Sequence, residues 1–436
     1  MASVWGRIGG VAAAMTLVAA AATARADDKK DAKAPASFAD TVARLQARPG
    51  LLPVYLDAKG GRVLLALPCD DKGDCGSFLY QVYMRAGLGS TPVGLDRSAA
   101  AQTQILAFHR AGKKVMAELQ NNGFRAGAGG AEEQSVRDSF APSIVWSGDI
   151  AAEDKDGQVL VDISAFLTRD AFNASDALKG AGQGTFKAVK ELSYPDVASV
   201  EAFPENLEFE AHQTFASDEP GREVQGIAPE PHSITLVEHH SLIKLPAPGF
   251  KPRLADPRTG GFAEIVSDFS APLDKPLTLQ LAHRFRLEKT DPTAARSPVK
   301  KPIVFYVDRG APEPVRTALM EGAQWWNQAF EAAGFIDAFR VDVLPEGVSP
   351  LDARYNVINW VHRQTRGWSY GVNIIDPRTG EIVKAAVLLG SQRVRQDRII
   401  FEGLEGADKT GKGGPDDPIT VSLARLRQLA VHETGH

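Results

Sequence analysis

The sequence predicts an α+β protein in which a β-rich N-terminal domain precedes a mixed, twisted sheet with packed helices. Three observations support this class. Between about residues 50 and 290, short β-like runs alternate with turn signals rich in Gly, Pro and Asp. A polar, Pro-containing stretch over residues 288–301 then separates two regions. After it, buried-strand runs alternate with helical periodicity, which is typical of a sheet covered by helices.

The composition is that of a globular protein. The chain has 436 residues, of which 44% are hydrophobic and 24% are charged. At roughly 150 residues per domain, this length suggests two or three domains. The formal net charge of −5 gives no indication that nucleic acid or an anionic membrane is a partner. The sequence carries no signature of an oligomeric state.

The first 26 residues differ from the rest of the chain. Arg7 provides a short basic start, residues 8–24 are apolar and Ala-rich, and Ala24-Arg25-Ala26 is a cleavage site of the A-x-A type. Residues 1–26 are therefore interpreted as a secretory signal peptide, with an uncleaved membrane anchor as the alternative. Cleavage would leave a periplasmic or secreted protein without a membrane span. Residues 27–40 read as a flexible linker.

The two cysteines, Cys69 and Cys75, lie six positions apart. In an oxidising compartment, thiols this close usually pair, so a structural disulfide is the leading interpretation. Two alternatives stay open. One is a thiolate that inhibits a distant metal centre, and the other is a calcium site formed by Asp70, Asp71 and Asp74.

Residues 41–295 are assigned to the β-rich accessory domain. Strands are predicted at 62–67, 159–163 and 233–237, and one helix at 98–111. His239 and His240 lie in a β-like run, where neighbouring side chains point to opposite faces, so they cannot easily bind one metal ion. They are expected to be solvated or hydrogen-bonded.

Residues 296–436 form the second region. Strands are predicted at 303–307, 339–343 and 355–361, followed by a hairpin of 371–375 and 382–389 around a turn at 376–380. Between Pro312 and Gly334, apolar residues at spacings of three and four predict a helix. The pair Trp325-Trp326 in this helix is expected to pack in the core. Asp352 and Arg354 are expected to form a structural ion pair.

The last predicted helix, residues 420–436, ends in His432-Glu433-Thr-Gly-His436. Residues four apart on a helix lie one turn above another, so His432 and His436 can bind one zinc ion. Zinc lowers the pKa of bound water, and Glu433 is placed to act as general base toward that water. This HExxH pattern predicts metal-assisted hydrolysis of an amide bond.

The stretch 302–436 resembles bacterial zinc-dependent metalloproteases of the metzincin-like group that carry a large N-terminal domain of unknown function. The similar segments are 325–335, 352–356, 376–382 and 432–436, with a further one at 87–97 in the N-terminal region. The resemblance implies a zinc metalloendopeptidase that acts on peptide or protein substrates. It also implies that an antiparallel edge strand within residues 370–390 pairs with the substrate backbone.

The motif of that group continues as HExxHxxGxxH, with a third histidine six residues after the second, and a methionine turn follows later. The sequence ends at His436, so the domain is expected to be C-terminally incomplete. A catalytic zinc usually has three protein ligands and a water, so the 436-residue chain is expected to bind zinc weakly and to cleave little. The alternative function is a non-catalytic exported binding protein with an inert peptidase domain. A zinc hydrolase acting on a non-peptide amide is a third option.

Overall fold

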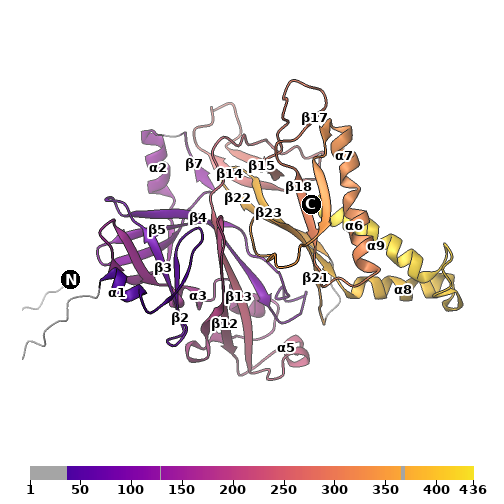
Figure 1. Ribbon diagram of the computed structural model, residues 1–436, viewed down its shortest axis with the longest axis horizontal. Helices are drawn as coiled ribbons and strands as arrows, with labels where there is room; N and C mark the ends of the chain where they lie inside the picture. The colour runs from indigo at the N-terminus through magenta and orange to yellow at the C-terminus, as the bar shows by residue number, and fades with distance from the viewer. Residues whose placement is uncertain (1–36, 128, 365–368) are drawn as a thin grey trace, which may run out of the picture. The chain divides into compact units, whose positions relative to one another are not determined.

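The computed structural model describes residues 37–127, 129–364 and 369–436, and it confirms a β-rich α+β protein (Figure 1). The predicted signal peptide and residues 27–36 of the predicted linker lie outside the described residues. The predicted end of the linker at residue 40 is wrong, because residues 38–40 are helical. Helix α1 (Phe38–Val42) begins there because the Ser37 side chain caps it by accepting a hydrogen bond from the Asp40 amide.

The N-terminal region is built on a twelve-stranded sheet. The strands follow in the order β1-β2-β3-β9-β8-β6-β5-β4-β13-β12-β10, and β11 also pairs with β12. Their bounds are β1 (Gln46–Arg48), β2 (Val54–Asp57), β3 (Arg62–Pro68), β4 (Asp74–Ala86), β5 (Gln104–Ala111), β6 (Lys114–Leu119), β8 (Ser143–Glu153), β9 (Gln158–Asp162), β10 (Lys187–Ala188), β11 (Tyr194–Ala202), β12 (Asn206–Ala216) and β13 (Ser233–Lys244). The predicted strands at 62–67, 159–163 and 233–237 are confirmed as β3, β9 and the start of β13.

This sheet curls so that strands from both of its ends share one core. Val63 of β3, Phe108 of β5 and Phe209 of β12 belong to a single buried cluster. The two ends also meet directly, because the Leu51 amide donates a hydrogen bond of 2.7 Å to the Phe203 carbonyl oxygen. Short helices flank the sheet, namely α2 (Ala131–Ser139), α3 (Ser164–Leu167), α4 (Ala174–Gly180), α5 (Arg222–Ile227) and the 3-10 turn η1 (Lys190–Leu192).

The C-terminal region is a six-stranded mixed sheet. Its order is β16-β23-β21-β18-β20, and β22 pairs antiparallel with β23. The strands are β16 (Arg284–Phe285), β18 (Ile303–Val307), β20 (Phe339–Val343), β21 (Asn356–Val361), β22 (Tyr370–Asp376) and β23 (Glu381–Gly390). The five strands predicted for this region are all present. The chain enters this sheet at β16, upstream of the predicted boundary between residues 295 and 296.

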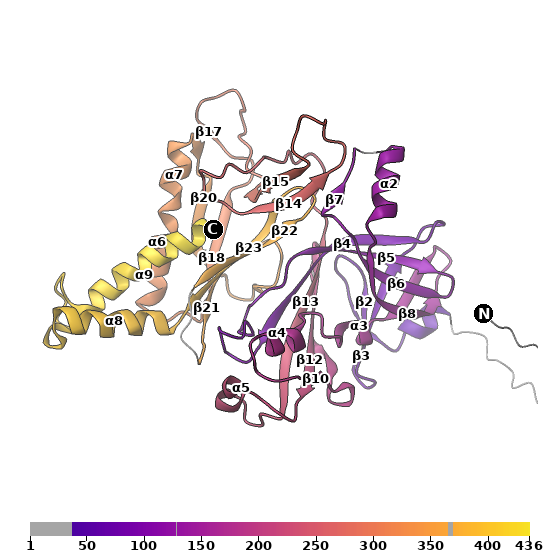
Figure 2. The same cartoon turned by 180° about the vertical axis from the view of Figure 1, so that it is seen from behind.

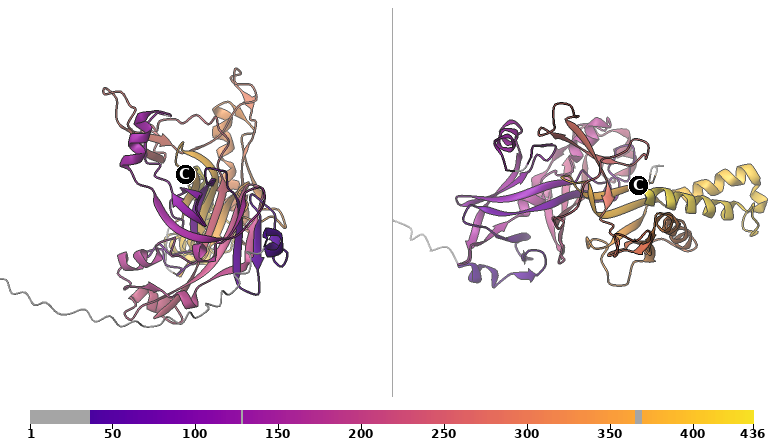
Figure 3. Two further views of the ribbon diagram at one scale, coloured as in Figure 1. Left: turned by 90° about the vertical axis from the view of Figure 1, so that its left-hand side faces the viewer. Right: turned by 90° about the horizontal axis from the view of Figure 1, so that it is seen from above.

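Helices α6 (Val315–Gln324) and α9 (Pro418–Gly435) pack on one face of this sheet, as seen from behind in Figure 2. Leu319 of α6, Leu426 of α9 and Phe305 of β18 share its core. The single helix predicted between Pro312 and Gly334 is divided at Trp325, where α7 (Trp326–Ala332) begins. Helix α8 (Gln392–Glu405), which was not predicted, runs beside α9, and the turn η2 (Ala407–Lys409) follows it (Figure 3).

The opposite face of the six-stranded sheet contacts the curled sheet. Leu79 of β4 and Ile243 of β13 pack with Ala353, against Ile374 of β22 and Val383 of β23. A buried ion pair between Asp96 and Arg363 adds a polar tie at the same junction. Asp96 belongs to residues 87–97, one of the segments that resemble the metalloprotease group, so this segment connects the two regions.

Smaller pairings complete the fold. β14 (Ala263–Asp268) pairs with β15 (Thr278–Ala282) and with β7 (Phe124–Arg125), and β17 (Ser297–Pro298) pairs with β19 (Phe335–Ile336). Within the described part of the chain, no helix is long and apolar enough to cross a membrane.

Candidate metal centre

Helix α9 carries the HExxH motif, and its start is firmly fixed. Asp417 caps the helix by accepting hydrogen bonds from the amides of Ile419, Gly411 and Gly413, and Pro418 occupies the first turn. Leu426 and Ala430 bury one side of the helix against the sheet. The last turn therefore holds the motif at a defined place beside β22 and β23.

His432 and His436 present their ring nitrogens to each other. The two Nε2 atoms are 3.2 Å apart, and the candidate ligand atoms of His432, Glu433 and His436 all lie within 4.8 Å of one another. Two nitrogens that bind a tetrahedral zinc ion at about 2.05 Å lie about 3.3 Å apart. The histidine pair thus already has the separation of two zinc ligands.

Burial shifts the pKa values of Glu433 and His436 in the directions that favour metal binding and general-base catalysis. Desolvation raises the pKa of Glu433, against the opposing charges of His432 and Arg393. Desolvation, with a smaller contribution from His432, lowers the pKa of His436. A neutral imidazole keeps the lone pair that a metal ligand needs, and a carboxylate with a raised pKa is a stronger base.

Trp326 braces the motif from α7. Its indole Nε1 donates a hydrogen bond of 2.6 Å to the carbonyl oxygen of Val431, the residue before His432. Its ring also lies directly against Gly435, where an added Cβ would come within 2.4 Å of Trp326 Cζ2. The glycine between Glu433 and His436 therefore admits the indole ring. Trp326 packs against the core as predicted, whereas Trp325 is 47% exposed.

Strand β22 runs past the motif. A Cβ on Gly371 would lie 3.1 Å from the Glu433 carbonyl oxygen and 3.3 Å from the Cβ of His436. Among the strands that the structure describes, β22 pairs only with β23, antiparallel to it. It is therefore an antiparallel edge strand within the predicted range of 370–390.

A cavity of about 350 Å³ opens beside the motif. Glu433 and His436 line it together with Gly371 and Asn373 of β22. Its inner part is apolar and is formed by Trp326, Phe305, Phe330, Phe335 and Phe339. A neighbouring cavity of about 410 Å³ shares Asn373 and His283 with the first one and follows the outer side of β22 to Ile375. The two cavities therefore lie next to each other along β22, and His283 and Asn373 line both.

The N-terminal region contacts His436 and lines the second cavity. The Phe262 ring lies against the His436 ring, with centroids 5.3 Å apart. The His283 amide donates to the Phe262 carbonyl oxygen at 3.0 Å, and the His283 ring bonds to Glu264 at 3.1 Å. None of these residues was singled out in the sequence as part of a site, because no local motif marks them.

His362, Asp352 and Arg354 do not belong to the group of potential metal ligands around His432. His362 bonds through Nδ1 to the Ser391 hydroxyl at 2.7 Å. Within residues 37–127, 129–364 and 369–436, the one group of three or more potential metal ligands is His432, Glu433 and His436, so no third histidine completes the set there. Asp352 and Arg354 form the expected ion pair, 2.6 Å apart.

Cys69 and Cys75 form the expected disulfide. A free inhibitory thiolate is therefore absent from this form of the described chain. Asp70 and Asp74 hold the same loop together, because the Asp70 carboxylate accepts hydrogen bonds from the amides of Lys72 and Asp74. These contacts agree with a structural role for the loop.

His239 and His240 point to opposite faces of β13, as expected, but both are fully buried rather than solvated. His239 bonds to Glu208 at 2.5 Å and to Glu210 at 3.3 Å, and His240 bonds to the Tyr80 hydroxyl at 2.7 Å. Side chains of the neighbouring strands β12 and β4 satisfy the two rings, so solvation is not needed.

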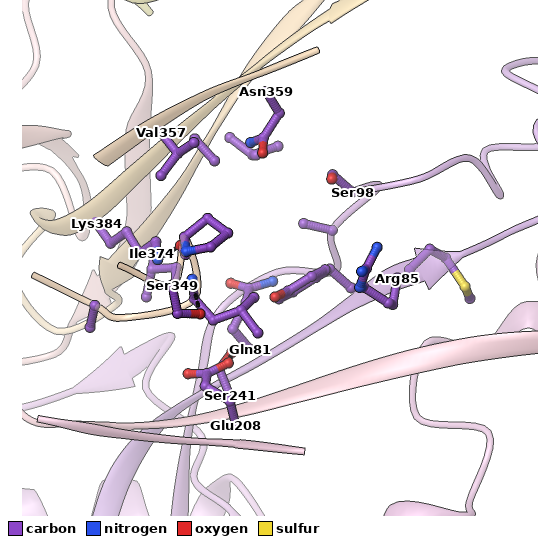
Figure 4. A pocket seen from close by; sticks show the side chains of 18 of the residues that line it. Gln81, Arg85, Ser98, Glu208, Ser241, Ser349, Val357, Asn359, Ile374 and Lys384 are labelled. Carbon is purple, nitrogen blue, oxygen red and sulfur yellow. Dashed lines mark hydrogen bonds between the residues drawn. The ribbon is translucent and has the colours of Figure 1, made fainter. Parts of the chain in front are cut away.

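Glu208 lines a further cavity of about 370 Å³ between the two sheets (Figure 4). Val372 and Ile374 of β22 and Lys384 of β23 also face it, on the side of the sheet away from α9. Lys384 donates to the carbonyl oxygens of Pro350 and Asp352, and burial lowers its pKa to about 8. These polar groups are largely satisfied within the protein.

Comparison with known proteins gives one family match. Residues 98–290 are similar to a domain of unknown function, DUF5117, which covers less than half of the chain. No curated protein and no solved structure matches the chain. The matched region ends after β16, so it includes Glu264 and His283, which line the cavity along β22, and Phe262, whose ring contacts His436.

Proposed function

We propose that this protein is a zinc-dependent metallopeptidase, with His432 and His436 as zinc ligands and Glu433 as general base. The observation that carries the proposal is the 3.2 Å separation of the two ring nitrogens beside a buried carboxylate, in the lining of a cavity that the edge strand β22 also lines. A metzincin-like catalytic domain, implied by the sequence resemblance, agrees with this arrangement.

When bound, zinc supplies a Lewis acid that polarises the scissile carbonyl and acidifies the attacking water. The side chains and main chain of the protein perform the proton transfer and position the substrate. Glu433 takes the proton of the attacking water and delivers it to the leaving amine. An extended peptide pairs by main-chain hydrogen bonds with the edge of β22 near Gly371 and Asn373, before Ile375, whose amide already donates to the Thr103 hydroxyl. This pairing orients the scissile bond across the last turn of α9. Trp326 holds that turn in place through Val431.

The resemblance implies a third histidine six residues past His436. The test therefore uses the natural gene product including those residues, because three protein ligands are usual for catalytic zinc. We expect about one zinc ion per chain by elemental analysis and cleavage of a quenched peptide library. A chelator should abolish cleavage, and added zinc should restore it.

Three variants separate the roles. Glu433→Gln is expected to keep zinc and lose cleavage, because the amide cannot accept the proton of the water. His432→Ala is expected to lose both. His362→Ala is the matched control and is expected to keep both, because its ring bonds to Ser391 and does not belong to the group of His432, Glu433 and His436. Equal cleavage by the wild type and Glu433→Gln would reject the mechanism.

A further inference from the structure

Two arginines, one from the loop before β14 and one from β16, line the cavity that contains Glu433 and His436. They are Arg253 and Arg284. The Arg253 carbonyl oxygen accepts a hydrogen bond of 2.8 Å from the Ala282 amide, and Leu254 forms an antiparallel bridge with Leu281. Arg253 thus lies opposite Ala282, two positions before Arg284, and both arginines line the same cavity.

The structure gives neither guanidinium a carboxylate partner. Among the described residues, no Asp or Glu oxygen lies within the 4.0 Å of an ion pair to Arg253 or Arg284. Glu381, the acid whose charge acts on Arg284, is held by Arg286 at 2.7 Å. Glu264, which lines the neighbouring cavity, bonds to His283. The acids near the pair therefore already have partners.

Arg284 is held in place without being neutralised. Its guanidinium lies 4.3 Å from the centre of the Phe250 ring, and it donates to the Lys251 carbonyl oxygen. Its Nε atom is buried and has no hydrogen-bond partner. Burial, and then the charge of Arg253, lower its pKa, so the two like charges interact. Such a pair in a cavity costs free energy that an incoming anion relieves.

We propose that Arg253 and Arg284 bind a carboxylate of the substrate, so that the enzyme prefers peptides with a carboxylate close to the scissile bond. This rests on the proposed function, because the pair shares its cavity with Glu433 and His436. Paired guanidiniums suit a planar carboxylate, which accepts two hydrogen bonds at once. The aromatic inner part of the cavity takes an adjacent apolar side chain.

The carboxylate comes either from the peptide C-terminus or from an Asp or Glu side chain. The test measures binding rather than cleavage, by fluorescence anisotropy on metal-free Glu433→Ala protein. Four labelled peptides of one apolar sequence serve as probes. Two differ only in a free or amidated C-terminus, and two amidated ones differ only in Glu or Gln at one internal position.

At least one carboxylate peptide is expected to bind more tightly than its neutral partner, and the pair that differs identifies the source. Arg253→Gln and Arg284→Gln are expected to weaken that binding about tenfold, the scale of a hydrogen bond to a charged group. Binding of the neutral peptides should not change. Arg258→Gln is the matched control, because Arg258 is in the same loop but pairs with Asp256 outside the cavity.

Arg253→Gln is the more decisive variant, because Arg253 is exposed and its loss leaves the fold intact. Arg284→Lys, which keeps the charge, should recover part of the affinity. Equal binding of carboxylate and neutral peptides, or no binding of any of the four, would overturn the proposal. Failure of the peptidase mechanism would appear separately, as a natural gene product without zinc or with cleavage independent of Glu433.

Discussion

The indole nitrogen of Trp326 and the carbonyl oxygen of Val431 are joined by a hydrogen bond of 2.6 Å, one residue before the first histidine of the motif. Replacing Trp326 by Phe removes this donor while keeping an aromatic ring. We expect the free energy of unfolding to fall by about 1 kcal/mol, and zinc affinity to fall severalfold because the last helical turn loses its brace. Urea denaturation and zinc titration measure both.

Trp325→Phe is the control for that change. Trp325 is 47% exposed, so its replacement should alter the free energy of unfolding by no more than about 0.5 kcal/mol. If the two variants behave alike, the bond from Trp326 does not position the motif.

Gly435→Ala tests the contact between the motif and the indole ring. In an open helix, Ala is favoured over Gly by about 1 kcal/mol. Here the new Cβ would lie 2.4 Å from Trp326 Cζ2, and the ring is tied down by its hydrogen bond, so it cannot easily move away. Overpacking costs about 1–3 kcal/mol, so a net loss of stability and of zinc affinity is expected.

Gly403→Ala in α8 provides the matched comparison. Outside its own helical turn, no atom lies within 4 Å of the position of its Cβ. The higher helix propensity of Ala over Gly is therefore the only effect expected on stability. Thermal melting should show this variant to be as stable as the wild type or more so, by up to about 1 kcal/mol. If Gly435→Ala raised the free energy of unfolding, the Trp326 ring would be shown to move aside without loss of stability.

Glu238 introduces a pH dependence of stability. Burial, with the nearby Asp170, raises its pKa to about 8, above the ordinary 4.5. Between these two values the folded protein holds a proton that the unfolded chain releases, so stability falls as the pH rises from 4.5 to 8. The fall from this group is on the order of a few kcal/mol. Denaturation of wild type and Glu238→Gln across this range measures it.

The amide of Glu238→Gln does not titrate, so its stability should depend less on pH over the same interval. Glu132→Gln, at an exposed position on α2, should keep the wild-type dependence. Parallel curves for the wild type and Glu238→Gln would contradict the raised pKa.

The Cys69–Cys75 disulfide closes a short loop. By the loop-entropy relation, breaking it should cost about 2 kcal/mol of stability. Neither cysteine lines the cavity beside His436, so peptide cleavage per folded molecule should not change on reduction. Cleavage by the wild type with and without dithiothreitol checks this, and the double variant Cys69→Ala/Cys75→Ala, which has nothing to reduce, is the control for any effect of the reagent on the metal. A changed rate would revive the idea of a thiol that acts on the metal centre.

Local patterns predicted much of this molecule, and long-range contacts explain where they failed. The strands at 303–307 and 339–343 were found within their predicted bounds, because their alternation matches a sheet with one helix-covered face. The helix predicted at 98–111 is wrong. Ser98 has a left-handed φ of 67°, and residues from Gln104 onward pair with β4 and β6 instead.

The candidate site likewise has residues that the sequence predicted and residues that it did not. His432, Glu433 and His436 share one turn of one helix, so their spacing alone identified them. Arg253 and Phe262 reach this place through the bridge from Leu254 to Leu281 of β15 and the bond from the His283 amide to Phe262, and Arg284 reaches it through the pairing of β16 with β23. These contacts are long-range, so no local spacing in the sequence indicates them. The burial of His239 likewise depends on Glu208 and Glu210, which the register of β12 brings opposite.

Strand β16 has a practical consequence for dividing the gene. Arg284 and Phe285 pair with Glu381 and Ile382 in the six-stranded sheet, and Arg286 holds the Glu381 carboxylate. An expression clone beginning at residue 296 would delete a strand from the sheet it was meant to preserve and leave a buried acid without its counterion. The two regions are therefore expected to be inherited, expressed and unfolded as one piece.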